Sequence, residues 1–199
     1  MAKSHPQPCR WMALDEALRV FVVAEEGVEG SGHIRAMHWY VACRLVLEGG
    51  FHPDTVTPRP PFRVEEKGRR RFLHHDSSSA GWGEATVFGG LKTKNVDVVV
   101  SIDGIGPCVA VSVKGSLNAF RNLTNRLEEA VGDCTNIHIT YPALVYGFVH
   151  LVRANREGPI PENGRRFLKP DPKTGLTRLA DVAIRSNEAV SSYVSFYHS

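Results

Sequence analysis

Two residues of complementary chemistry, Asp97 and Lys114, stand on neighbouring segments that are rich in valine. If residues 96–102 and 107–114 form an antiparallel hairpin, Asp97 lies opposite Ser112. Side chains alternate between the faces of a strand, so Asp97, Ser112 and Lys114 then share one face, and the valines point into a core. An acid and a lysine on such a sheet cost desolvation free energy unless they are paired or bind an ion. The pattern therefore indicates a functional site.

A carboxylate beside a lysine suits metal-assisted hydrolysis of a phosphodiester bond. The carboxylate can hold a divalent cation, and the lysine can orient the attacking water and counter charge on the phosphate. A second acid should converge on the metal, and position 112 carries Ser. Glu128, fourteen residues after Lys114 on the next expected helix, is the predicted second acid, and Glu129 is expected to face about 100° away from it around the helix.

These residues and their order resemble the PD-(D/E)XK nuclease superfamily. A helix, three strands, a helix and a strand are expected in sequence, with Asp97 on one strand and Ser112-Val113-Lys114 on the next. Type II restriction endonucleases that cut sites built around CCGG have S-x-K at this place, with the missing acid on the next helix. The spacing from Lys114 to Glu128 resembles that variant, and the resemblance covers residues 84–152.

The resemblance implies an α/β fold: a restriction-endonuclease-like three-layer sandwich with a mixed central β-sheet flanked by helices. It also implies an Mg²⁺-dependent endodeoxyribonuclease with one or two metal ions per active site. Asp97 and Glu128 would hold the metal, Lys114 would position the water, and Ser112 would complete the catalytic motif. Glu48, at the end of the early helix, is the candidate for completing a second metal site.

The periodicity of apolar residues predicts the elements that position these groups. We expect one domain over residues 1–199, in which 1–50 hold two helices, 84–152 the catalytic core, 155–175 a basic loop or ribbon and 176–199 the C-terminal helix. The expected helices are 11–25, 33–48, 116–131 and 176–197, with Gly132 as a helix stop. The expected strands are 84–91, 96–102, 107–114, 137–140 and 143–153. Four prolines predict that 51–82 is irregular.

Basic and amide side chains near the expected site are the candidates for DNA contact, since Arg and Lys bind phosphates and Asn and Arg pair with base edges. Arg121 and Arg126 also stand where the resemblance has arginines. A further basic cluster lies at 69–71. The candidates are Lys92, Lys94, Asn118, Arg121, Asn122, Asn125, Arg126, Arg165 and Arg166. The expected partner is double-stranded DNA. Cutting of a palindrome implies a homodimer. A cognate DNA methyltransferase could belong to the same type II system.

The composition is that of a globular protein. The chain has 199 residues, 42% hydrophobic residues and a formal net charge of +3, which excludes collagen-like and disordered chains. Its four cysteines form no CxxC pair, and Cys43 and Cys108 stand among apolar neighbours, so buried free thiols are expected. The sequence has no apolar run long enough for a membrane span, and its first residues have no apolar core of the kind found in secretory signals. A cytoplasmic protein is therefore expected.

Other functions stay open. The same fold could serve a DNA-binding protein without catalysis, in which Ser112 marks the decay of the metal site. Within the nucleases, a repair or junction-cleaving enzyme is the alternative to a restriction enzyme. A third alternative is a small-molecule enzyme that uses the histidines of His74-His75-Asp76.

Overall fold

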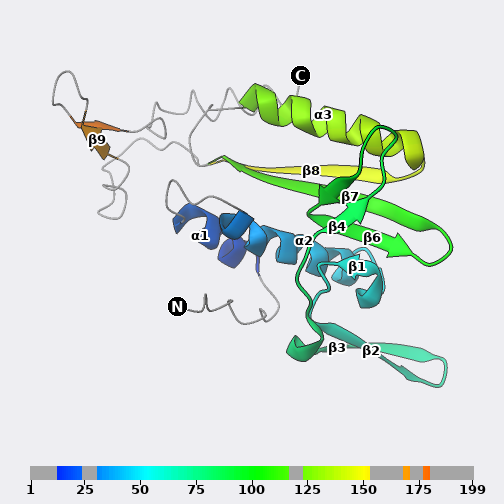
Figure 1. Cartoon of the computed structure of the whole chain (residues 1–199). Coiled ribbons are helices and arrows are strands. Elements are labelled where there is room, and N and C mark those ends of the chain that lie inside the picture. The colour runs from blue at the N-terminus through cyan, green and yellow to red at the C-terminus, as the bar shows by residue number, and fades with distance from the viewer. Residues whose placement is uncertain (1–12, 24–30, 117–122, 153–167, 171–176, 180–199) are drawn as a thin grey trace, which may run out of the picture.

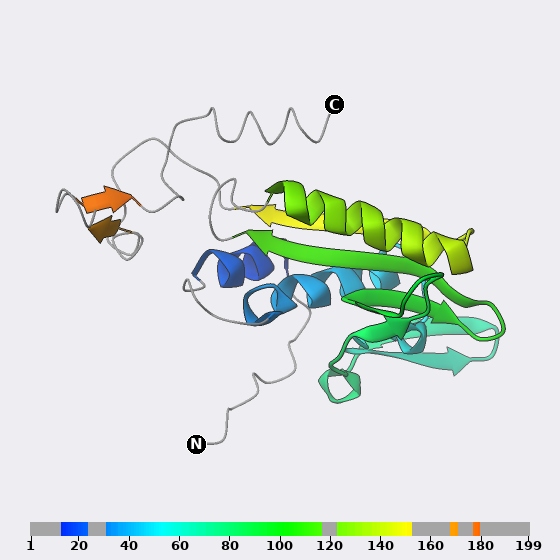
Figure 2. The same ribbon diagram turned by 45° about the horizontal axis from the view of Figure 1, so that its top comes forward.

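The computed structural model describes residues 13–23, 31–116, 123–152, 168–170 and 177–179 (Figure 1). Helices cover both faces of a four-stranded mixed sheet, with α1 and α2 on one face and α3 on the other. Figure 2 shows the same arrangement after rotation, with the sheet between the two helical layers. The expected α/β class with a mixed sheet is therefore confirmed.

The sheet has the strand order β1-β6-β7-β8. Its strands are β1 (Val56–Thr57), β6 (Val98–Ile102), β7 (Gly106–Ser116) and β8 (Val145–Val152). The first two pairings are antiparallel, and β7 pairs with β8 in parallel. Because parallel strands cannot be joined by a tight turn, α3 (Leu123–Thr140) forms the crossover from β7 to β8.

The β6–β7 hairpin has the register that a turn at residues 103–106 predicts. Val98 pairs with Val111 and Val100 pairs with Val109. This is the register in which Asp97 lies opposite Ser112. The register shifts by one after Val100, so Ile102 pairs with Gly106. Gly104 and Gly106 turn the chain with φ of 76° and 89°, a region that side chains disfavour.

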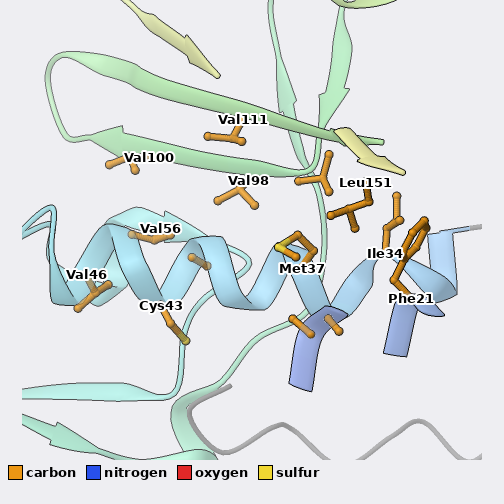
Figure 3. Packing of buried hydrophobic residues seen from close by; sticks show 14 of the residues in the cluster. Phe21, Ile34, Met37, Cys43, Val46, Val56, Val98, Val100, Val111 and Leu151 are labelled. Atoms are coloured by element: carbon orange, nitrogen blue, oxygen red, sulfur yellow. The ribbon is translucent and has the colours of Figure 1, made fainter. Parts of the chain in front are cut away.

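One face of the sheet packs on α2 (Arg35–Leu47) and α1 (Leu14–Val23). Figure 3 shows this core, where Met37 and Ile34 meet valines of β6 and β7. Phe21 from α1 packs at one end of the same cluster and Val46 at the other. The helix expected over 33–48 is confirmed over 35–47, and the helix expected over 11–25 is confirmed over 14–23, its remaining ends, 11–12 and 24–25, lying outside the described residues.

The opposite face packs on α3. Ile137 of this helix is fully buried against Val99 and Ala110 of the sheet. Val96 belongs to this cluster too, although the sequence predicts that it points to the same side as Val98. The prediction is wrong because a bend at Asp97 separates the two residues and resets the alternation.

Three further pairs of short strands complete the described structure. In each, the two strands are antiparallel. They are β2 (Phe62–Lys67) with β3 (Arg70–His75), β4 (Ala85–Val87) with β5 (Lys94–Val96), and β9 (Leu168–Pro170) with β10 (Thr177–Leu179). Single turns of 3-10 helix, η1 (Ser31–His33), η2 (Pro53–Thr55) and η3 (Ser77–Ser79), lie between longer elements.

Several predicted boundaries are wrong. Residues 51–82 are not irregular throughout, since the β2–β3 hairpin begins directly after Pro61. The strand predicted over 84–91 ends at Val87. The helix predicted to stop at Gly132 continues to Thr140 and includes residues 137–140, for which the sequence predicts a strand. A helical glycine costs only about 1 kcal/mol, and burial of Ile137 offsets it.

The C-terminal predictions fall mainly outside the described residues. Of the basic segment 155–175, the described part is β9, whose pairing with β10 forms a ribbon. Thr177–Leu179 are in β10, so the helix predicted over 176–197 is wrong at these residues. The rest of that helix lies outside the described residues.

Candidate functional site

Asp97 stands at the bend between β5 and β6, and it is 8% exposed. Its Oδ2 accepts a hydrogen bond from the backbone N–H of Val113 at 2.7 Å and one from the Ser112 hydroxyl at 3.4 Å. Because β6 begins only at Val98, the carboxylate, and not a backbone carbonyl, accepts the hydrogen bond from the Val113 N–H. The structure brings Asp97 and Ser112 together as the hairpin register predicts.

His38 approaches Asp97 from α2. Its Nε2 is 3.6 Å from Asp97 Oδ1 and makes no hydrogen bond to any described residue. Burial lowers the pKa of His38 below its ordinary value, although the charge of Asp97 opposes this shift. Lys114 lowers the same pKa, which places the Lys114 charge within electrostatic reach of both residues. His38 is therefore neutral at pH 7.

Lys114 lies on β7, two residues beyond Ser112, and it meets α3. Its Nζ is 3.6 Å from Oε1 of Glu129, and Oε2 of the same carboxylate accepts a hydrogen bond from Arg126 at 2.9 Å. Partial burial raises the pKa of Glu129, but Lys114 and Arg126 outweigh it, so the net shift is downward. Glu129 stays ionised between two cations.

Glu128, the predicted partner of Lys114, is exposed on α3. The face of α3 that rests on the sheet carries Glu129, Asp133 and Ile137 at four-residue spacing. Since one residue turns a helix by about 100°, Glu128 points away from this face. The acid that contacts Lys114 is thus Glu129, one position after the Glu128 that the spacing predicts.

A second acid–lysine contact lies beside the first. Asp133 Oδ1 is 2.8 Å from the Nζ of Lys94 on β5, and both side chains are largely buried. Tyr146 of β8 lies close by, and burial raises the pKa of its hydroxyl to about 12, although the nearby Ser112 side chain opposes this shift. The buried hydroxyl makes no hydrogen bond to any described residue. The site is therefore a polar strip between the sheet and α3 that begins at Asp97.

Glu48 does not reach this strip. It forms the C-terminal cap of α2, its side chain is exposed, and it pairs with Arg44 at 2.9 Å. His38, ten residues earlier and about 15 Å away along the helix axis, is the α2 residue that faces Asp97. Glu48 therefore lies almost three helical turns from the α2 residue that faces Asp97.

The candidates for DNA contact fall into three groups. Lys94 and Arg126 are engaged with Asp133 and Glu129. Lys92 and Asn125 are exposed, and the backbone of Lys92 bonds to the Asn136 side chain. The others lie outside the described residues: Asn118, Arg121, Asn122, Arg165 and Arg166.

The sequence reasoning missed His38, Glu129, Asp133 and Tyr146 as members of the site. The spacing of Glu129, Asp133 and Ile137 is a signal that could have identified two of them, because residues four apart share a helix face. No comparable pattern marks His38, since the seven buried residues among the thirteen of α2 include four in a row, 36–39, and do not follow a single apolar face.

Within the described residues, no three His, Cys, Asp or Glu side chains are grouped to hold a metal ion. None of the described helices is long and apolar enough to cross a membrane. Comparisons of the chain with protein-family models, with curated proteins and with solved structures find no match. The case for a function therefore depends on the geometry.

Proposed function

We propose that the protein is a metal-dependent endonuclease that hydrolyses phosphodiester bonds of double-stranded DNA, with a restriction-endonuclease-like fold. The observation that carries the proposal is the buried Asp97 in contact with Ser112 and Val113, next to Lys114, which faces Glu129. A lysine, a buried acid and a second acid thus lie on adjoining strands and the helix that follows them.

The order of elements supports the same proposal. Helix α2 is followed by β1, β6, β7, α3 and β8, with β2 to β5 between β1 and β6. The order of a helix, three strands, a helix and a strand resembles that of PD-(D/E)XK nucleases, but the first sheet strand is β1 and not the strand expected over 84–91. That strand, β4, pairs with β5 outside the four-stranded sheet. Lys114 lies on the third sheet strand, as that resemblance also implies, whereas Asp97 lies at the bend before the second sheet strand and not on it.

The donor atoms fit a hard cation that keeps most of its water. Mg²⁺ is usually bound through one or two carboxylates together with waters and phosphate oxygens, so a cage of three side chains is not required. Oδ1 of Asp97 faces a His38 nitrogen at 3.6 Å that lacks a hydrogen-bond partner among the described residues, and this oxygen is the one that would bind the cation. Asp97 would hold the metal, and Glu129 replaces Glu128 as the second acid.

The bound cation would supply Lewis-acid polarisation of the phosphate and a more acidic water. The other contributions come from the chain. Ser112 and the Val113 N–H hold the Asp97 carboxylate in one orientation. Lys114, kept in place by Glu129, orients the attacking water and counters the charge that develops on the phosphate.

The test is cleavage of supercoiled plasmid and phage DNA with Mg²⁺ or with EDTA. We expect the wild type to give discrete ends with Mg²⁺ alone and the variants Asp97→Ala and Lys114→Ala to give none. Asp103→Ala removes an exposed acid from the β6–β7 turn and is the matched control, which should cleave normally. Unchanged cleavage by Asp97→Ala and Lys114→Ala would contradict the proposal.

A DNA-binding protein without catalysis is the second candidate. Ser112 occupies the position of an acid, and the described residues include no ready group of three metal ligands. DNA binding without cleavage by the wild type, under every divalent cation tried, would favour this candidate. A smear in place of discrete ends would favour a nonspecific or repair nuclease over a restriction enzyme.

A further inference from the structure

We propose that the β2–β3 hairpin is a DNA-binding ribbon that enters a groove of the duplex, an inference that rests on the proposed function. The hairpin lies between β1 and β6 in sequence, outside the four-stranded sheet. Figure 1 shows it on the far side of α2 and β1 from α3. A two-stranded antiparallel ribbon is one of the two elements that the major groove admits.

The base of the hairpin is anchored. Phe62, at the start of β2, is buried, and the ring of His75 on the partner strand packs edge-on against it with centroids 6.3 Å apart. The Asp76 N–H donates to the carbonyl of Pro61 at 2.8 Å, and the Ser79 hydroxyl donates to that of Phe62 at 3.1 Å. The ribbon therefore has a fixed direction.

The tip carries a dense positive charge. Four of the five residues 67–71 are Lys or Arg, and the fifth, Gly68, adopts a φ of 63° that lets the chain turn tightly. Lys67 contacts Glu65 at 3.1 Å, and Arg71 contacts Glu66 at 2.9 Å. Arg69 and Arg70 are exposed and have no ion pair with any described residue.

The cations also favour one face of the ribbon. Paired residues in a hairpin share a face, so Arg63, Lys67 and Arg70 lie together with His74, Phe72 and one acid, Glu65. Glu65 contacts Lys67 and His74, and Arg63 lies 3.9 Å from Asp76, so Arg70 is the cation of this face that has no ion pair with a described residue. Every residue of β3 is exposed, so this face needs no rearrangement to meet a ligand. Unpaired arginines on an exposed ribbon match the phosphates and base edges of a groove better than they match an apolar protein partner.

The experiment measures binding to a 30-base-pair duplex by fluorescence anisotropy, in EDTA so that cleavage cannot interfere. We expect Arg69→Ala/Arg70→Ala to bind on the order of ten-fold more weakly than the wild type. The slope of log K against log salt should become shallower by about one for each phosphate that the variant no longer neutralises. Arg19→Ala removes one exposed charge from α1, far from the hairpin in sequence, and should bind as the wild type does.

The two proposals fail in different ways. If the wild type binds and cleaves DNA and the hairpin variant has the same affinity and salt slope, the ribbon is not a DNA contact and the nuclease proposal stands. If the wild type neither binds nor cleaves DNA, the proposed function fails and the ribbon proposal with it. A hairpin variant that loses self-association in sedimentation, with unchanged DNA affinity, would make the ribbon a protein contact and overturn the inference. Circular dichroism should show the same fold in every variant.

Discussion

A carboxylate that accepts a backbone N–H is held in one orientation, and this is the state of Asp97. The Val113 N–H and the Ser112 hydroxyl both donate to the same oxygen. The other oxygen faces His38 and makes no closer contact than 3.6 Å to that ring. One oxygen of the carboxylate thus bonds to β7, and the other is the one that would bind a cation in the proposed function.

Asp97→Asn separates these two functions. The amide oxygen can still accept the Val113 N–H, so the free energy of unfolding should change by only about 1 kcal/mol. Cleavage should fall by about a hundred-fold or more, since a neutral side chain holds a divalent cation poorly. Plasmid cleavage and urea unfolding measure the two effects. A variant that cleaves normally would show that the carboxylate charge is not used.

We expect His38 to make the stability of the fold depend on pH. Burial lowers its pKa, Asp97 raises it, and Lys114, Arg35 and His33 lower it further. Because the folded pKa is below the unfolded one, the unfolded state binds more protons at acidic pH. The His38 contribution is therefore complete above the ordinary pKa of about 6.5 and is lost as pH falls toward the folded value.

The matching experiment compares the wild type with His38→Gln in thermal unfolding between pH 5 and pH 8, a range of about three units around the ordinary pKa of histidine. The wild-type Tm should fall faster below pH 6.5 than the Tm of the variant. His52→Gln, at an exposed histidine before η2, is the control and should keep the wild-type slope. Equal slopes for the wild type and His38→Gln would show that His38 does not cause the pH dependence.

At the scale of elements, the face that α3 presents to the sheet decides which acid contacts Lys114. Glu129→Gln should lower cleavage by about ten- to a hundred-fold, as loss of a group that orients a catalytic residue commonly does. Glu128→Gln, one residue away and exposed, should leave cleavage within about two-fold of the wild type. The pair is matched in chemistry, so the opposite ranking would favour the spacing argument over the observed helix face.

The packing of the same helix can be tested without reference to activity. Ile137 is 0% exposed, so Ile137→Ala should lower the free energy of unfolding by about 2–4 kcal/mol. Val131 on the same helix is 66% exposed, and Val131→Ala should change it by less than about 0.5 kcal/mol. Urea unfolding of both variants provides the measurement. Similar losses for the two would mean that α3 presents a different face to the sheet.

These elements show what the sequence could predict. The β6–β7 register follows from placing the hairpin turn at residues 103–106, which pairs Val98 with Val111. The exact acid on α3 does not follow, since adjacent glutamates offer the same chemistry and only packing of Ile137 decides between them. His38 could not be predicted, because its role depends on a sheet residue almost sixty positions later in the chain.

At the scale of the whole molecule, the described residues of each chain form one candidate site. Cutting both strands of a palindrome requires two sites related by a twofold axis, so we expect two chains on each duplex. Sedimentation of the protein on a short duplex, with Ca²⁺ in place of Mg²⁺, should give this stoichiometry. A single chain per duplex that still yields double-strand breaks would contradict the expectation and indicate sequential nicking.

The contact between Asp97 and Val113 has a consequence for spectroscopy. The Val113 amide proton is bonded to a side-chain carboxylate, whereas its neighbours in β7 are bonded to backbone carbonyls where they pair with β6 or β8. Any event that turns or recharges that carboxylate must alter the resonance of this one amide. The central strand of the sheet therefore contains its own reporter of what reaches Asp97, with no label added to the site itself.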